Sequence, residues 1–298
     1  MKKILILIII FNLANKSYSQ QMEFVKDSIM DYYMKSGYAS KHFRPNGKYD
    51  KNDLRQGEWK DYEVVNDFEY VSVNGKPTQI FGYFLLYGEG KFVDGKRVGS
   101  WKFYVIEDKT FKRKLQKEVI YKDGKKDGPF KYFYPNGIIG MNGEHNSNEY
   151  EGEIKSYYDN GKLYGTRIYR SGLLQGRQVY LHINGKILLE HHFINDTLHG
   201  RYQTYYMNGN TEEVFIYNKG KEDGIYQYYY ENGQLWIEKE YKNGLLMNVN
   251  GSYDSNGNSR DYGSIRNGNG TINYYTEEGR IYNTQTFENG LKVKEEEK

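Results

Sequence analysis

A short and regular repeat constrains the fold of this 298-residue chain more than any other feature. Asn-Gly pairs recur at a constant spacing of 24, with glycines at Gly137, Gly161, Gly185, Gly209, Gly233 and Gly257. A second series of turn residues interleaves at the same spacing, at Gly172, Asp196, Gly220, Gly244 and Gly268. Because one such unit cannot bury its apolar face alone, a regular period of this length indicates a stack of repeats.

The composition of the repeats favours strands over helices. The segments between the turns are rich in Tyr, Ile and Phe and poor in Leu and Ala, which suits a pleated sheet. An Asn-Gly pair tolerates the positive φ angles that a two-residue type I′ hairpin loop requires at both positions. The sequence therefore predicts an elongated all-β protein, a single-layer twisted meander of antiparallel β-hairpins with one hairpin in each repeat.

The repeat around Gly233 predicts two unlike faces for this sheet. An Asn232-Gly233 loop places Tyr230 opposite Leu235 and Tyr228 opposite Ile237. Since side chains alternate along a strand, these residues share a tyrosine-rich apolar face. That face is covered either by its own twist and curl, which we favour, or by a partner.

The opposite face is polar and carries one aromatic stripe. The stripe consists of Phe133, Tyr157, Tyr205, Tyr229 and Trp236. Tyr and Trp side chains on rigid strands are typical anchors of protein interfaces. We therefore take the stripe as the candidate partner-binding surface.

The regular repeats occupy residues 121–290, with a shortened interval near the end. Residues 49–120 hold irregular copies with inserts, because the spacing from Trp59 to Trp101 is 42. Residues 20–48 are predicted to cap the first strand, and Val25, Ile29 and Tyr33 indicate a short helix there. Residues 291–298 form a charged tail.

Residues 1–19 are predicted to be a cleaved secretory signal peptide. Lys2 and Lys3 precede an apolar run, residues 4–11, that is too short to span a bilayer, and small residues precede Gln20. The mature chain would be exported to the periplasm, the cell surface or the medium. It would carry 39 basic and 39 acidic residues. A net charge of zero disfavours nucleic-acid binding, which depends on neutralising phosphates.

The sequence offers little for catalysis. It has no cysteine, which excludes disulfides, thiolate metal sites and a cysteine nucleophile. It has no G-x-S-x-G, phosphate-loop or H-E-x-x-H motif, so we expect neither an enzyme nor a metal or other cofactor. His191 and His192 should point to opposite faces, and a two-histidine site that includes His199 remains an alternative.

One insert gathers basic residues. They are Lys109, Lys112, Arg113, Lys114 and Lys117. Such a tip is a candidate contact for anionic lipid or for an acidic partner, the alternative being a solvated hairpin end.

The repeat resembles the MORN family (membrane occupation and recognition nexus), in its bacterial variant form. The matching stretches are Tyr229-Tyr230-Glu231-Asn232-Gly233 and Gly220-Lys221-Glu222-Asp223-Gly224-Ile225-Tyr226. The resemblance covers about residues 50–290 and implies a hairpin-repeat scaffold that binds another protein or a membrane surface. Bacterial variants include the YwqK family of antitoxins, which implies a third function, the neutralisation of a toxic partner protein.

Overall fold

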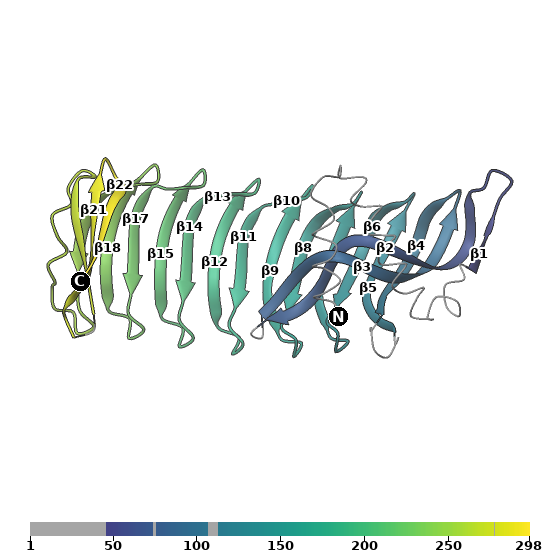
Figure 1. Ribbon diagram of the computed structural model, residues 1–298, viewed down its shortest axis with the longest axis horizontal. Helices are drawn as coiled ribbons and strands as arrows, with labels where there is room; N and C mark the ends of the chain where they lie inside the picture. Colours follow the sequence, from purple (N-terminus) through teal and green to yellow (C-terminus); the bar gives the residue numbers. More distant parts are fainter. Residues whose placement is uncertain (1–45, 74–75, 107–112, 277) are drawn as a thin grey trace. The chain divides into compact units, whose positions relative to one another are not determined.

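The computed structural model describes residues 46–73, 76–106, 113–276 and 278–298. The predicted signal peptide and most of the predicted N-terminal cap lie outside these ranges. The described residues form 22 strands, β1 to β22, and no helix. None of them therefore belongs to a helix that could cross a membrane. The prediction of an all-β fold made of antiparallel hairpins is confirmed (Figure 1).

The chain divides into two compact units. The first unit comprises the described residues up to Tyr150 together with Ser156–Gly161. The second unit comprises Glu151–Lys155 and Lys162–Lys298, so the division falls within β8 (Glu149–Tyr157).

The first unit is an antiparallel meander in which each strand pairs with the next. Its strands are β1 (Asn46–Tyr49), β2 (Arg55–Val73), β3 (Lys76–Val93), β4 (Lys96–Ile106), β5 (Arg113–Lys122), β6 (Lys125–Phe133) and β7 (Ile139–Asn146). The β2–β3 hairpin is much longer than a repeat hairpin and pairs without interruption from Gly57↔Phe92 to Val73↔Lys76. The insert inferred between Trp59 and Trp101 is therefore an extension of this hairpin.

The second unit contains most of the regular repeats. Its meander consists of β9 (Leu163–Arg170), β10 (Leu173–Leu174), β11 (Gly176–Leu181), β12 (Ile187–Ile194), β13 (Thr197–Leu198), β14 (Gly200–Tyr205), β15 (Thr211–Asn218), β16 (Lys221–Glu222), β17 (Gly224–Tyr229), β18 (Leu235–Lys242) and β19 (Leu245–Ser252). A regular repeat pairs one continuous strand with a strand interrupted before a glycine in the left-handed region, such as Gly200 (φ 81°). Equivalent residues therefore recur every second long strand, on the same face of the sheet.

The Asn-Gly turns are not the type I′ loops that the sequence predicted. At Asn232-Gly233, the Gly233 N–H donates to the Tyr230 carbonyl (2.8 Å) and the Tyr230 N–H to the Gln234 carbonyl (2.9 Å). Gly233 has a positive φ (90°) and Asn232 has not. This is a three-residue loop, a type I turn followed by a glycine in the left-handed region.

The two-residue loops occur instead in the second turn series. Asn243 and Gly244 both have positive φ, at 52° and 84°. The prediction therefore assigned the right hairpins to both series but the wrong loop to the Asn-Gly pairs.

The additional loop residue changes the strand register beside it. Tyr228 pairs with Ile237 as predicted, but Leu235 pairs with Tyr229 rather than Tyr230, and the strand bulges between these pairs. The Trp236 ring consequently packs beside Tyr228 and Tyr230, at centroid distances of 5.1 and 5.7 Å. The assignment of Trp236 to the stripe on the polar face is wrong, because a bulge sets two residues against one and shifts the alternation.

Side chains of the Tyr-x-Asn-Gly motif tie each turn to the turn of the next repeat. The Tyr206 hydroxyl donates to the Tyr229 carbonyl (2.6 Å), and Asn208 Nδ2 donates to the Glu231 carbonyl (2.9 Å). The same bonds run from Tyr134, Asn136, Asn184, Tyr230 and Asn232, each to the carbonyl 23 residues further on. These bonds give donors to carbonyls in and beside the next turn.

Aromatic rings pack against one another on the apolar face. In the first unit Trp59 and Trp101 are each 1 % exposed. Trp101 lies so close over Gly90 that a Cβ there would fall 2.3 Å from its ring, and the Arg97 guanidinium lies 4.8 Å from its centroid. In the second unit the rings are half-buried and continue from one repeat to the next, as at Phe215 and Tyr226 (4.4 Å). Tyrosine thus supplies contact area that aliphatic side chains supply in most cores.

The C-terminal end forms a separate three-stranded sheet, β20 (Gly270–Tyr275), β21 (Ile281–Glu288) and β22 (Leu291–Glu297). Together with β18 and β19 it encloses an aliphatic core that consists of Ile237, Leu246, Val249, Ile265, Ile272 and Phe287. All but the last of the residues expected to be a charged tail form β22, which is exposed at all seven positions and charged at five. Charges at a sheet edge discourage pairing with another chain.

Removing one bond between repeats should lower the stability of the second unit. We expect Tyr206→Phe to cost about 1–2 kcal/mol, because the Tyr229 carbonyl loses its donor. Urea unfolding of both proteins measures the difference. Tyr282→Phe is the control, since its ring is 43 % exposed, and it should change stability by less than about 0.5 kcal/mol. Equal effects of the two substitutions would contradict the role of the bond.

Lowering the pH should reduce the folding stability of the first unit, because His145 becomes protonated. Its imidazole is 5 % exposed and lies 4.4 Å from the Phe130 ring, and burial, assisted by Lys126 and Lys117, lowers its pKa to about 4. The fold prefers neutral His145, so this stabilisation is complete above the ordinary pKa of 6.5 and is lost as pH falls towards 4.

The variant His145→Phe isolates this contribution. Between pH 6.5 and 4 the wild-type chain should lose about 1–2 kcal/mol more stability than the variant, solvent screening reducing the full pKa difference. Urea midpoints measured across this range test it, and identical pH dependences would contradict it.

Candidate functional site

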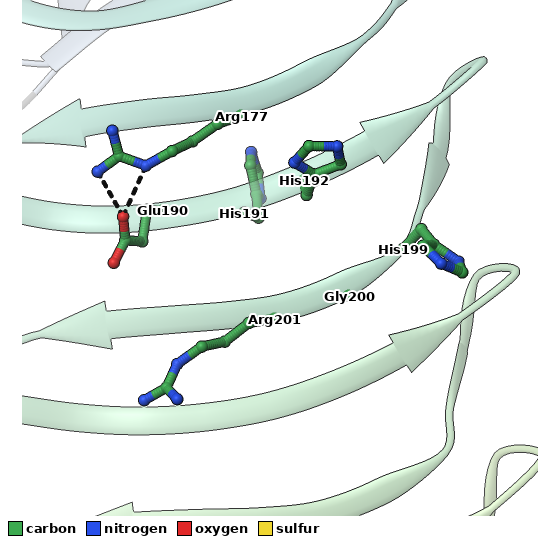
Figure 2. A pocket seen from close by; sticks show the side chains of 7 residues that line it. All are labelled: Arg177, Glu190, His191, His192, His199, Gly200 and Arg201. Carbon is green, nitrogen blue, oxygen red and sulfur yellow. Dashed lines mark hydrogen bonds and ion pairs between the residues drawn. The ribbon is translucent and has the colours of Figure 1, made fainter.

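The polar face of the second unit has a hollow of about 340 Å³ over β11, β12 and β14 (Figure 2). Its lining consists of Arg177, Glu190, His191, His192, His199, Gly200 and Arg201. Two guanidinium groups, one carboxylate and the imidazoles of His192 and His199 thus line the hollow.

Strand pairing explains why these charged groups share a face. Arg177 pairs with His192 and Val179 pairs with Glu190, so Arg177, Glu190 and His192 point to the same side of the sheet. Arg201 occupies the position of Arg177 one repeat later. The repeat therefore sets two arginines in a row across the strands.

Glu190 is held by two partners. Arg177 donates from Nε and Nη2 to Glu190 Oε2 (2.9 and 2.6 Å), and the Tyr205 hydroxyl donates to Oε1 (2.6 Å). The Tyr205 hydrogen bond, followed by Arg177, lowers the pKa of Glu190. Burial, followed by Glu190, raises the pKa of Tyr205 to about 12. At neutral pH the carboxylate is therefore charged and the phenol remains a donor.

Two neighbouring side chains hold Arg201 in position. Its Nε donates to Gln203 Oε1 (2.8 Å), and Gln203 Nε2 donates to Thr211 Oγ1 (2.9 Å). Gln203 is 7 % exposed, so this support lies beneath the surface. Among the residues that the structure describes, no side chain or carbonyl accepts from the terminal amino groups of Arg201.

The histidines divide between the two faces, as the sequence predicted. The His191 ring lies 4.9 Å from Phe193 and 5.7 Å from Tyr202 on the tyrosine-rich face, and burial lowers its pKa. His192 and His199 line the hollow. Within the described ranges, no three His, Cys, Asp or Glu side chains gather as a metal site would require.

The other four residues of the stripe stay a predicted contact surface. Phe133, Tyr157, Tyr205 and Tyr229 are half-buried. The Tyr157 hydroxyl donates to Asn142 (3.4 Å) and that of Tyr229 to Gln227 (2.9 Å). Phe133 and Tyr157 belong to the first unit, and Tyr205 and Tyr229 to the second. Only Tyr205 adjoins the hollow, through Glu190.

Sequence reasoning missed the arginines and Glu190. The available signal was the spacing of 24 between Arg177 and Arg201, which equals the repeat. Aromatic residues in that register indicated a surface, whereas charged residues in the same register received no role.

The basic insert is only partly a surface feature. Lys109 and Lys112 lie outside the described residues. Arg113 and Lys114 are exposed at the start of β5, and the Arg113 guanidinium lies 3.4 Å from the Tyr87 ring centroid. Lys117 is 6 % exposed, with Nζ 5.0 Å from the Phe103 ring centroid. Its assignment as a lipid or partner contact is wrong, because it pairs with Phe103 on the apolar face.

The coupling between Glu190 and Tyr205 can be measured directly. In Glu190→Gln the negative charge beside the phenol is lost, so the pKa of Tyr205 should fall from about 12 towards its ordinary value of 10. The ¹³Cζ shift of Tyr205 followed by NMR against pH gives this value. Tyr229, which bonds to Gln227, is the internal control. An unchanged Tyr205 pKa would contradict the coupling.

No family model matches the chain, and no curated protein matches it either. The likeness to the MORN repeat therefore rests on the turn and strand residues named above, and the hollow is interpreted from its own geometry.

Proposed function

We propose that this chain is a non-catalytic, exported repeat scaffold that binds a protein partner along the polar face of its hairpin sheet. The observation that carries the proposal is the fixed set of aromatic and charged groups on that face, formed by Arg177, Glu190 and Tyr205. Tyr and Arg are the residues most enriched among the energetic centres of protein interfaces.

The different packing of aromatic rings on the two faces supports the polar face as the binding surface. On the apolar face the rings pack against one another, as Tyr202 and Phe215 do at 5.9 Å. On the polar face Tyr205 and Tyr229 keep half-buried rings among hydrogen-bonded polar neighbours. Side chains already held in place lose little conformational freedom when a partner binds.

The pKa values of Glu190 and Tyr205 support a binding role rather than acid–base catalysis. A general acid or base works best with a pKa near the working pH. The pKa of Glu190 is lowered and that of Tyr205 is raised to about 12, so both move away from neutrality.

Export follows from the predicted signal peptide at residues 1–19. Its charged start, apolar run and small residues match the pattern of such signals. We therefore place the mature scaffold in the periplasm, on the cell surface or in the medium. If its partner is a toxic enzyme, the scaffold acts as an antitoxin-like neutraliser.

A membrane-surface function remains a second candidate because Arg113 and Lys114 are exposed. It rests on fewer residues than the sequence suggested, since Lys117 is buried. Sedimentation of the mature protein with anionic liposomes, lost at high salt, would favour this candidate.

Crosslinking in native cells tests the scaffold function. We expect the C-terminally tagged wild-type chain to capture one stoichiometric protein. The double variant Tyr205→Ser/Tyr229→Ser should capture at least about tenfold less, which corresponds to about 1.4 kcal/mol. It should still fold, because both rings are only half-buried.

The matched control is Met207→Ser/Tyr282→Ser. These side chains are 54 % and 43 % exposed and lie outside the polar face of the repeats. The control should capture the partner as the wild type does. Equal losses in both double variants, or unfolding of the stripe variant, would contradict the proposed binding face.

A further inference from the structure

The two arginines of the hollow occupy equivalent positions but have different partners. The repeat interval that relates Arg177 to Arg201 also relates Glu190 to Val214 and Tyr205 to Tyr229.

In the first set, a carboxylate of the chain itself satisfies the arginine. Glu190 accepts two hydrogen bonds from Arg177 and one from Tyr205. In the second set Val214 stands in place of Glu190 and is 5 % exposed. Tyr229 bonds to Gln227 instead of a carboxylate. Arg201 thus occupies the position of Arg177 but has Gln203, and no carboxylate, as its hydrogen-bond partner.

Arg201 is nevertheless positioned as a binding arginine would be. Its Nε is held by Gln203, which is buried and is held in turn by Thr211. This support fixes the guanidinium plane and leaves both terminal amino groups without an acceptor in the described residues. Two parallel N–H donors match the two oxygens of a carboxylate, and ordering them in advance lowers the cost of binding.

The charges around Arg201 favour an anionic ligand. Arg177 already neutralises Glu190, the one carboxylate in the lining. Arg201, His192 and His199 are the other side chains in the lining that can donate hydrogen bonds from the polar face. An incoming carboxylate therefore meets a positive guanidinium and no unpaired carboxylate of the lining.

We propose that Arg201 binds a carboxylate side chain of the protein partner through its two terminal amino groups, since its Nε is held by Gln203. This inference rests on the proposed scaffold function and adds the chemistry of the contact, an acidic segment seated over the hollow. The equivalent arginine one repeat earlier, Arg177, binds a carboxylate, and this favours a carboxylate over a phosphate as the ligand of Arg201.

NMR of the purified mature protein labelled with ¹⁵N-arginine tests the inference. The probes are a capped tetraglutamate peptide and inorganic phosphate, each titrated while the Arg201 Nε–Hε resonance is followed. We expect a saturable shift with the peptide and a much weaker response to phosphate. Arg201→Gln should abolish peptide binding, and Arg280→Gln, which removes another exposed arginine, should leave it unchanged.

A second variant supplies the missing acid from within. Val214→Glu should place a carboxylate within reach of the terminal amino groups of Arg201, and should weaken peptide binding at least about tenfold. Circular dichroism establishes that the variant is folded. If it is not, the exposed Arg201→Gln variant alone decides the question. Undiminished peptide binding by a folded Val214→Glu variant would overturn the inference.

Two other results would also overturn it. One is the absence of a saturable Arg201 shift, and the other is a stronger response to phosphate than to the peptide. The crosslinking experiment separates this inference from the function on which it rests. If Arg201→Gln captures the partner as well as the wild type does, the scaffold function stands and the carboxylate contact is wrong. If the wild type captures nothing, the scaffold function fails, and with it the assignment of the carboxylate to a partner.

Discussion

The hydrogen bonds from Tyr and Asn side chains to the next turn are the interactions on which the rest of the repeat structure depends. Tyr206 and Asn208 each reach a carbonyl 23 residues further along the chain. A bond of this kind requires the next turn to stand two strands away, at about 10 Å. It therefore fixes the repeat length and brings equivalent residues into rows.

The rows have different consequences on the two faces. On the apolar face they bring rings into contact from one repeat to the next, as with Phe215 and Tyr226. On the polar face they bring Arg177 and Arg201 to the same hollow. One periodic constraint thus produces both the packing that stabilises the sheet and the charged surface that we propose binds a partner.

The sequence was sufficient for the architecture because turn residues and strand residues repeat together. It was not sufficient for the loop geometry. Asn-Gly is compatible with a two-residue and a three-residue hairpin loop, and only the backbone bonds around Tyr230 distinguish them. The resulting bulge moved Trp236 to the other face, where it packs beside Tyr228.

Contacts between residues far apart in the sequence explain the other differences between the predicted and the observed structure. The charged residues 291–298 suggested a tail, but β22 pairs with β21 and completes a sheet over the aliphatic core. The charge of Lys117 predicts a surface position, but strand pairing sets this residue beside Phe103. The hollow was not predicted for a further reason. The difference between Arg177 and Arg201 becomes apparent only when Glu190 and Val214 are compared as equivalent positions of the repeat.

Site-specific photo-crosslinking in native cells tests the central claim most directly. A photoreactive phenylalanine derivative would replace Tyr229 on the polar face or Tyr217 on the apolar face in otherwise identical chains. Tyr217 and Tyr229 are both half-buried tyrosines of the second unit. The account predicts a crosslinked partner protein from position 229 and none from position 217. Crosslinks to a partner from position 217 alone would contradict it, because the tyrosine-rich face would then be the binding surface.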